Sequence, residues 1–167
     1  MKTKNLEKRL AGLLGQALGD LKKDTSSISV RLNIMVPRDG FLSIIAHTSG
    51  YSQEELTIKL AGNQGCAGES WQNGVEVVGD RTKKHDSDWD IPPEEAQKVN
   101  KNLKSIISVP IYDPDYYDSF LGIGPIIGIL NADSESIYAG ELLDITQIVL
   151  RRYALRIAEI LEEYSNA

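Results

Sequence analysis

The chain has 167 residues, a mass of 18.4 kDa, a net charge of −6 and a pI near 5.0. This length fits one well-buried domain and is short for two, and the acidic balance argues against a nucleic-acid partner, because phosphate binding needs clustered Lys and Arg. No run approaches the ~20 apolar residues that span a bilayer. A single cysteine with two histidines argues against a disulfide within the chain and against a zinc site. We therefore expect a cytoplasmic protein that neither spans a membrane nor binds a metal ion.

The first predicted element is an amphipathic helix from Lys4 to Lys23. Its apolar residues recur three and four apart and form one stripe, made of Leu6, Leu10, Leu13, Leu14, Ala17, Leu18 and Leu21. Two interpretations remain open, namely a helix that covers a sheet and a helix that contacts a second copy of the chain through Leu10 and Leu14. In either case residues 1–24 are expected to belong to the same domain as residues 25–167.

Two strands are predicted next, at Ile28–Val36 and Phe41–Thr48. The first alternates apolar and polar residues with a period of two, which indicates one firmly buried face. Asp39-Gly40 is typical of the turn of a hairpin. His47, at the end of the second strand, is a candidate ligand contact, and the alternative is a hydrogen-bonded residue at the rim of the sheet.

The segment Gly62–Gly74 is rich in glycine and precedes a third predicted strand, Val75–Gly79. Ser52 with Glu55, upstream of it, predicts a short capped helix. A second short helix is expected at Ala67–Gln72. Its first amides would attract anions or carbonyl oxygens.

A charged stretch, Asp80–Asp90, contains an isolated aromatic residue, Trp89. Such a ring either covers a pocket or anchors the loop by its burial. Pro92 and Pro93 suit the first turn of a further helix, which we expect to continue to about Leu103.

Two short β-branched runs, Ser105–Ile111 and Pro125–Leu130, predict a central hairpin. The second run has apolar residues on both faces and is expected to be covered on both. The connection from Asp113 to Gly124 is acidic and rich in Tyr and Gly.

A long amphipathic helix is predicted at Ala139–Tyr164. Ile148 and Leu155 stand seven residues apart on its otherwise charged side. They are either ordinary surface residues or the start of a helix-to-helix seam, and we favour the seam.

This order of elements predicts an α+β fold with an antiparallel sheet, terminal helices on one face, and short helices and loops on the other. Three segments resemble the GAF domain family, which has a PAS/profilin-like architecture. They are Gly65-Cys66-Ala67-Gly68 with the strand after Asn73, Leu103–Ile111, and Ile127–Ser134. The resemblance covers nearly all of Leu6 to Tyr164.

The resemblance implies a regulatory module that binds a small molecule of unknown identity and signals through dimerising terminal helices to a partner protein. The ligand is expected between the sheet and the middle helices, and no cofactor is identified. The candidate ligand-binding residues are Gly65, Cys66, Ala67, Trp71, Asp88, Trp89, Ser108 and His47. The candidate dimer residues are Leu10, Leu14, Ile148 and Leu155.

Three functional hypotheses remain: a ligand sensor, a purely structural dimerisation domain, and an enzyme that uses Cys66 as a nucleophile. We favour the sensor and expect no enzymatic activity. One branch of the family reduces free methionine sulfoxide with several cysteines. A single cysteine cannot form the intramolecular disulfide of that cycle.

Overall fold

The computed structural model describes residues 2–24 and 29–165. Its first elements are α1 (Lys2–Asp24), β1 (Val30–Arg38), β2 (Phe41–His47), the 3-10 helix η1 (Glu55–Thr57), β3 (Lys59–Leu60) and α2 (Gly65–Asn73). The later elements are β4 (Val77–Asp80), the 3-10 helix η2 (Asp86–Trp89), α3 (Pro93–Ala96), β5 (Ser105–Tyr112), β6 (Ile126–Ser134) and α4 (Gly140–Ser165).

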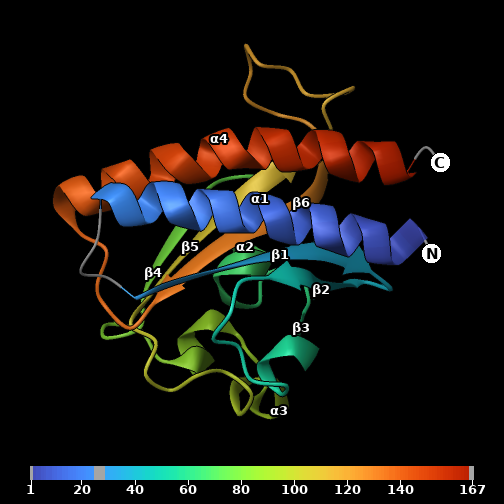
Figure 1. Ribbon diagram of the computed structural model, residues 1–167. Coiled ribbons are helices and arrows are strands. Elements are labelled where there is room, and N and C mark those ends of the chain that lie inside the picture. The colour runs from blue at the N-terminus through green and yellow to red at the C-terminus, as the bar shows by residue number, and fades with distance from the viewer. Residues whose placement is uncertain (1, 25–28, 166–167) are drawn as a thin grey trace.

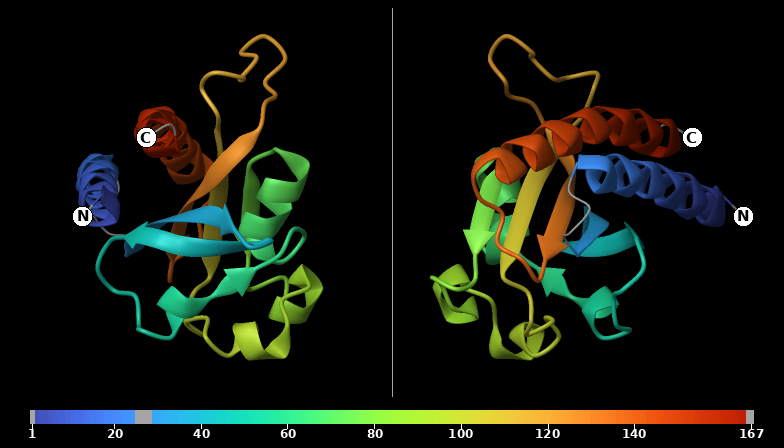
Figure 2. Two further views of the ribbon diagram at one scale, coloured as in Figure 1. Left: turned by 90° about the vertical axis from the view of Figure 1, so that its right-hand side faces the viewer. Right: turned by 60° about the vertical axis from the view of Figure 1, so that its left-hand side comes forward.

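The six strands form one antiparallel sheet in the order β3-β2-β1-β6-β5-β4. The expected hairpin, β5 with β6, lies inside this sheet, and β6 pairs with both β5 and β1. α1 and α4 lie side by side across one face, and α2 and the short helices cover the other (Figures 1 and 2). This arrangement confirms the predicted α+β fold.

The core between the helices and the sheet follows from the alternation in β1. Val30, Leu32 and Ile34 point toward the helical layer and are buried there. The α1 stripe meets α4 in the same cluster, where Leu14 and Ile157 are fully buried. Burying apolar surface of this kind contributes about 25 cal/mol per Å², so this layer is a major source of stability.

The opposite face of β1 is also buried, although its residues are mostly polar. Arg31, Asn33 and Met35 alternate with the apolar set, and they are 8%, 6% and 3% exposed. They form the floor beneath the layer of short helices. The buried polar residues of this face position the site described below.

Some element boundaries differ from those expected. Ile28 lies outside the described residues.

The two-residue turn at Asp39-Gly40 has positive φ at both positions, as a type I′ hairpin requires. Ser52 and Glu55 exchange the predicted capping hydrogen bonds, but the helix that they begin is a single 3-10 turn.

The helix expected to continue to Leu103 is wrong, since α3 ends at Ala96. The Asn100 side chain accepts a hydrogen bond from the amide of Asn102 at 2.9 Å, and the Asn100 carbonyl accepts one from Leu103. Such local side-chain bonds compete with the helical pattern. The chain is thereby free to turn into β5.

Candidate functional site

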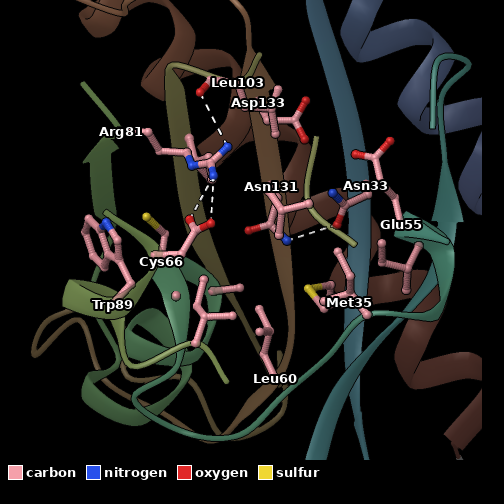
Figure 3. Close-up of a pocket in the computed structure, with 18 of the residues that line it drawn as sticks. Asn33, Met35, Glu55, Leu60, Cys66, Arg81, Trp89, Leu103, Asn131 and Asp133 are labelled. Carbon is pink, nitrogen blue, oxygen red and sulfur yellow. Dashed lines mark hydrogen bonds and ion pairs between the residues drawn. The ribbon is translucent and has the colours of Figure 1, made fainter. Parts of the chain in front are cut away.

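A cavity of about 90 Å³ lies between the sheet and the layer of short helices. Figure 3 shows Cys66, Arg81 and Trp89 on one side of it and Asn33, Met35 and Glu55 on the other. Its walls are largely apolar, with Met35, Ile44, Ile58, Leu60, Ala67, Trp89, Ile91, Val99, Leu103 and Ile106 among the lining residues. Its polar lining residues are Asn33, Asn131 and Asp133 on the strands, and Tyr51, Glu55, Arg81 and Asp86 on the loops and short helices.

Two glycines allow the α2 end of the cavity to close. A Cβ at Gly68 would lie 2.3 Å from the Ala61 carbonyl oxygen, so only glycine lets α2 pack against the preceding turn. A Cβ at Gly79 would lie 2.3 Å from the Cys66 Sγ and 3.3 Å from the Trp89 ring. The glycine on β4 therefore makes room for both side chains.

Cys66 is at the start of α2 and lines the cavity. Its side chain is buried, and burial raises the pKa of the thiol to about 12, with the charge of Glu69 adding to the effect. The thiolate is the reactive form of cysteine. Cys66 is therefore overwhelmingly a neutral thiol near pH 7.

The charged part of the floor is built around Arg31. Its Nε donates to the Asp133 Oδ1 at 2.8 Å and its Nη2 donates to the Glu55 Oε2 at 2.8 Å. Further bonds reach the Asp133 Oδ2, the Glu55 Oε1 and the Gly50 carbonyl. The Tyr51 ring lies 4.0 Å from the guanidinium carbon, a favourable cation–π geometry.

Two carboxylates thus share one guanidinium, which leaves this cluster with a formal charge of −1. Burial raises the pKa of Asp133 above its usual range, against the effect of Arg31. Burial acts in the same direction on Glu55, but hydrogen bonds from Arg31 and Ser52 bring the pKa of that carboxyl below its usual value. The excess negative charge favours a hydrogen-bond donor or a cation in the cavity.

A chain of neutral groups continues from Asp133 along the floor. Ser108 donates to Asn131 at 2.6 Å, and Asn131 donates to Asn33 at 3.0 Å. Asn33 donates to the Tyr51 hydroxyl at 3.0 Å, and this hydroxyl donates to the Asp133 Oδ2 at 3.3 Å. Because Ser108, Asn131 and Asn33 are register partners on adjacent strands, the sheet itself sets their spacing.

Arg81 lies across the cavity from this network. Its Nη2 donates to both Asp86 carboxylate oxygens, at 2.8 and 3.0 Å, and its Nη1 donates to the Asn100 carbonyl at 2.8 Å. Arg81 therefore ties η2 to the segment before β5. Trp89 is buried at the end of η2, with the Lys84 ammonium 4.3 Å from its ring centre.

The structure brings four of the predicted ligand residues to the cavity: Gly65, Cys66, Ala67 and Trp89. The other four lie elsewhere. Trp71 packs against the apolar cluster beside the cavity. Ser108 is fully buried and donates to Asn131, its register partner on the next strand. Asp88 accepts a hydrogen bond from the His85 amide, and exposed His47 pairs through its Nδ1 with the Thr48 carbonyl.

Of the four candidate dimer residues, two are buried and two are exposed. Leu10 and Leu14 are fully buried inside the chain, so the expectation that they face a second copy is corrected. The reason is that α4 already covers the α1 stripe. Ile148 and Leu155 remain 54% and 63% exposed.

Sequence reasoning missed the polar floor. Arg31 and Asn33 appeared only as the less buried positions of a strand, and Glu55 only as a helix cap. One signal was available: a charged residue in mid-strand, Arg31, pairs well with the acidic residue of another central strand, Asp133. The sequence predicted the two hairpins, but no local pattern indicated that β1 lies beside β6.

Within residues 2–24 and 29–165, no cluster of three or more His, Cys, Asp or Glu side chains has a geometry that could hold a metal ion. Among the helices that the structure describes, none is long and apolar enough to cross a membrane.

No protein-family model and no curated protein matches the chain, but solved structures do. The GAF domain of a phosphoenolpyruvate-protein phosphotransferase from Acinetobacter superposes with a TM-score of 0.70 at 14% identity, covering 97% of this chain and 85% of that one. The type II free methionine-R-sulfoxide reductase from Thermoplasma acidophilum gives 0.64 at 16%, covering 95% and 96%. The free methionine-R-sulfoxide reductase from Neisseria meningitidis, in complex with its substrate, gives 0.59 at 19%, covering 97% and 89%. The chain therefore has the GAF fold.

The expectation that the chain is not an enzyme is corrected by these comparisons. Several of the similar structures are free methionine-R-sulfoxide reductases, at identities between 16% and 19%. The fold of this chain is thus shared by GAF domains of other proteins and by enzymes. The single cysteine speaks only against a mechanism that closes a disulfide within the chain.

Proposed function

With the GAF fold as the premise, we propose that the chain is a regulatory module whose cavity binds a small organic ligand. The observation that carries this proposal is the pairing of apolar walls with a buried polar floor of net negative charge. Binding sites commonly combine an apolar lining with a few convergent polar groups. The arrangement favours a ligand with an apolar body and a hydrogen-bond donor, such as an amine, at one end.

The cavity volume limits the size of this ligand. A cavity needs about 10–15 Å³ to admit one water molecule, and an engineered apolar cavity of about 150 Å³ binds benzene. At about 90 Å³, the cavity suits a compact metabolite. A larger ligand requires movement of η2 and of the segment before β5, which Arg81 ties together.

Native mass spectrometry of freshly purified protein tests for a retained ligand, and thermal denaturation tests a panel of amines, amino acids, carboxylates and nucleotides. A ligand at about 100 times its Kd stabilises by about 2.7 kcal/mol, so we expect a rise in Tm of about 5–10 °C for a domain of this size. No shift from any panel compound, together with a spectrum of the bare chain, would reject the proposal.

A matched pair of variants links the shift to the cavity. Ala67→Leu adds side-chain volume to the cavity wall and should abolish the ligand-induced rise in Tm. Ala17→Leu makes the same change in the fully buried α1 layer on the other side of the sheet. It should lower the Tm of the free protein and retain the rise.

The proposal includes a homodimer as the signalling form, with α4 as the contacting helix. Ile148 and Leu155, both exposed on α4, support it because they are seven residues apart, the spacing of a helix-to-helix seam. Signalling would require the ligand to have different affinities for two states of this dimer. A partner protein would read that difference.

A second candidate function is reduction of a small sulfoxide, favoured by the presence of Cys66 in the cavity wall. The Cys66 Sγ would attack the sulfoxide sulfur, and the S–O bond would break with the oxygen leaving as water after protonation, which leaves the substrate sulfur bonded to Cys66. One thiol of an added dithiol would attack the Cys66 Sγ and release the thioether, and its second thiol would displace Cys66 and close the dithiol's disulfide. Incubation with free methionine-R-sulfoxide and dithiothreitol, followed by quantification of methionine, tests it. Product from the wild type but not from Cys66→Ser would support this function, and no product from the wild type would reject it.

A further inference from the structure

The connection between β5 and β6 projects from the body of the molecule beyond α4 (Figures 1 and 2). Its tip exposes large apolar side chains: Phe120 is 94% exposed, Leu121 61% and Ile123 58%. A monomeric protein rarely gathers such residues in one place. This concentration indicates a contact surface.

The tip is a built turn. The Asp118 Oδ1 accepts hydrogen bonds from the amides of Phe120 and Leu121, both at 2.9 Å. The Asp118 backbone also pairs with Ile123 as an isolated β-bridge. Phe120 is thus presented on an ordered support, and a preorganised segment loses less entropy on binding.

The base of the connection is fixed as well. The rings of Tyr112 and Tyr117 are stacked, with 4.8 Å between their centres. The Tyr112 hydroxyl donates to the Gly74 carbonyl at 2.6 Å. The base is therefore anchored to the turn between α2 and β4.

Next to this base lies a groove of about 400 Å³ between α4 and the β4–β5 edge. Val75 and Leu155, which are 51% and 63% exposed, are on its two sides. Gly122 of the projecting connection lines its end. The same molecule therefore carries an apolar knob and, beside it, a groove whose lining is mostly apolar and also includes the Glu76–Arg151 ion pair.

The charges near the knob and near the groove also differ in sign. The connection from Asp113 to Gly124 contains three aspartates and no Lys or Arg. Within its own chain this connection lies near Glu162. A hydrogen bond with Asp115 raises the pKa of the Glu162 carboxyl, and partial burial raises it further. Cations are found farther along α4, where Arg152 and Arg156 are exposed on the α1 side of Leu155, and Arg156 donates to the Gln16 side chain at 3.2 Å.

We propose that a second copy of this chain docks here, with Phe120 of each copy inserted in the groove beside Leu155 of the other. A two-fold axis near Leu155 buries both knobs and closes the assembly, because each contact is repeated in reverse. It also brings the acidic connection of one copy to the arginines of the other, which complements charge. The proposal rests on the homodimer suggested above and adds its contact surface.

Sedimentation velocity from about 1 to about 100 µM measures the dimer dissociation constant. We expect the wild type to dimerise and Phe120→Ser to weaken the dimer about tenfold or more, the typical effect of losing a buried aromatic anchor. Phe41→Ser is the matched control, since Phe41 is 43% exposed in the β1–β2 turn and should leave the constant unchanged.

A charge exchange gives a second readout that does not depend on apolar contacts. Asp115→Lys and Arg152→Glu should each weaken the dimer about two- to fivefold, and the double variant should recover part of the loss. Additive losses would overturn the charge pairing.

These measurements distinguish the homodimer itself from the specific contact of Phe120 with the groove. A dimeric wild type whose constant is unchanged by Phe120→Ser overturns the knob-in-groove contact and leaves the homodimer standing. A monomeric wild type at the highest concentration overturns both. Ligand binding is read independently, through the thermal shift that Ala67→Leu should abolish.

Discussion

Arg31 joins three parts of the chain through five hydrogen bonds to Asp133, Glu55 and the Gly50 carbonyl. All five donors of the guanidinium are used. A buried ion cluster is weak evidence for stability by itself, but removal of one partner leaves an uncompensated charge. Arg31 is therefore the residue on which the arrangement of the floor depends.

Replacing Arg31 tests this dependence. Arg31→Met leaves Asp133 and Glu55 buried together without their cation, so we expect a loss of about 3–5 kcal/mol in the free energy of unfolding. Urea titration followed by circular dichroism measures it. Arg38→Met, at the exposed end of the same strand, should change the value by less than about 0.5 kcal/mol. Equal losses from the two variants would contradict the assigned role of Arg31.

Cys66 gives a prediction on pH dependence. A free thiol with an ordinary pKa near 8.5 gains reactivity up to about pH 9. Burial raises the pKa of Cys66 to about 12, so the thiolate fraction, and with it the rate of reaction with iodoacetamide, should keep rising about tenfold per pH unit to at least pH 10. The rate at pH 8 should be far below that of the urea-unfolded chain. A plateau near pH 9 in the folded protein would show an ordinary thiol.

At the scale of elements, glycine has opposite effects in β4 and in α1. Gly79 is required by close approach, since a Cβ would meet the Cys66 Sγ at 2.3 Å. Gly12 lies on the exposed side of α1, and a Cβ there would have no neighbour within 4 Å. Among the described residues, no neighbour therefore packs closely against Gly12.

A double-mutant cycle tests the approach of α2 to β4. Gly79→Ala should destabilise the fold by about 1–3 kcal/mol through overpacking. Cys66→Ala removes the sulfur, so Gly79→Ala should cost less in that background. The residual cost should come from the Trp89 ring. Identical costs in both backgrounds, measured by urea unfolding, would mean that the sulfur is not the obstacle.

The α1 glycine gives a prediction of the opposite sign. Gly12→Ala should stabilise the protein by about 0.5–1 kcal/mol, because alanine loses less conformational entropy in a helix interior. A rise in Tm of about 1–4 °C is the corresponding measurement. A fall in Tm would mean that a contact to Gly12 exists in solution.

At the scale of the whole molecule, one sheet separates two layers with different roles. α1 and α4 supply the apolar layer, and the cavity lies on the opposite side. The Tyr153 hydroxyl donates to Asp20 at 2.6 Å and so links the two terminal helices. We therefore propose that residues 1–24 form one cooperative unit with residues 25–167.

Deletion of residues 1–24 tests that unit. The shortened chain would expose the apolar surface that Leu10, Leu14 and Leu21 cover, and we expect it to be largely unfolded. In the full chain, fluorescence of Trp71 and Trp89 reports the cavity side, and far-ultraviolet circular dichroism is dominated by the helices. The two urea transitions should coincide. A shortened chain with an unchanged midpoint, or separated transitions, would place α1 outside the domain.

The long periodic elements and the fold class could be predicted from the order of the residues alone. The α1 and α4 stripes, the alternation in β1 and the double-sided β6 were readable because hydrophobic periodicity follows directly from local backbone geometry. Gly65–Ala67 and Trp89 could also be predicted as cavity residues, because turn chemistry and an isolated aromatic residue are local signals in the sequence.

Which polar groups meet depends on how distant segments of the chain pack together. Arg31 is 24 residues from Glu55 and 102 residues from Asp133 along the chain, and strand order and register bring them together. The same holds for Leu10 and Leu14, whose stripe fits a partner or a sheet equally well until α4 is seen to cover it. Local patterns specify that a side chain is buried, whereas the identity of its neighbours depends on long-range packing.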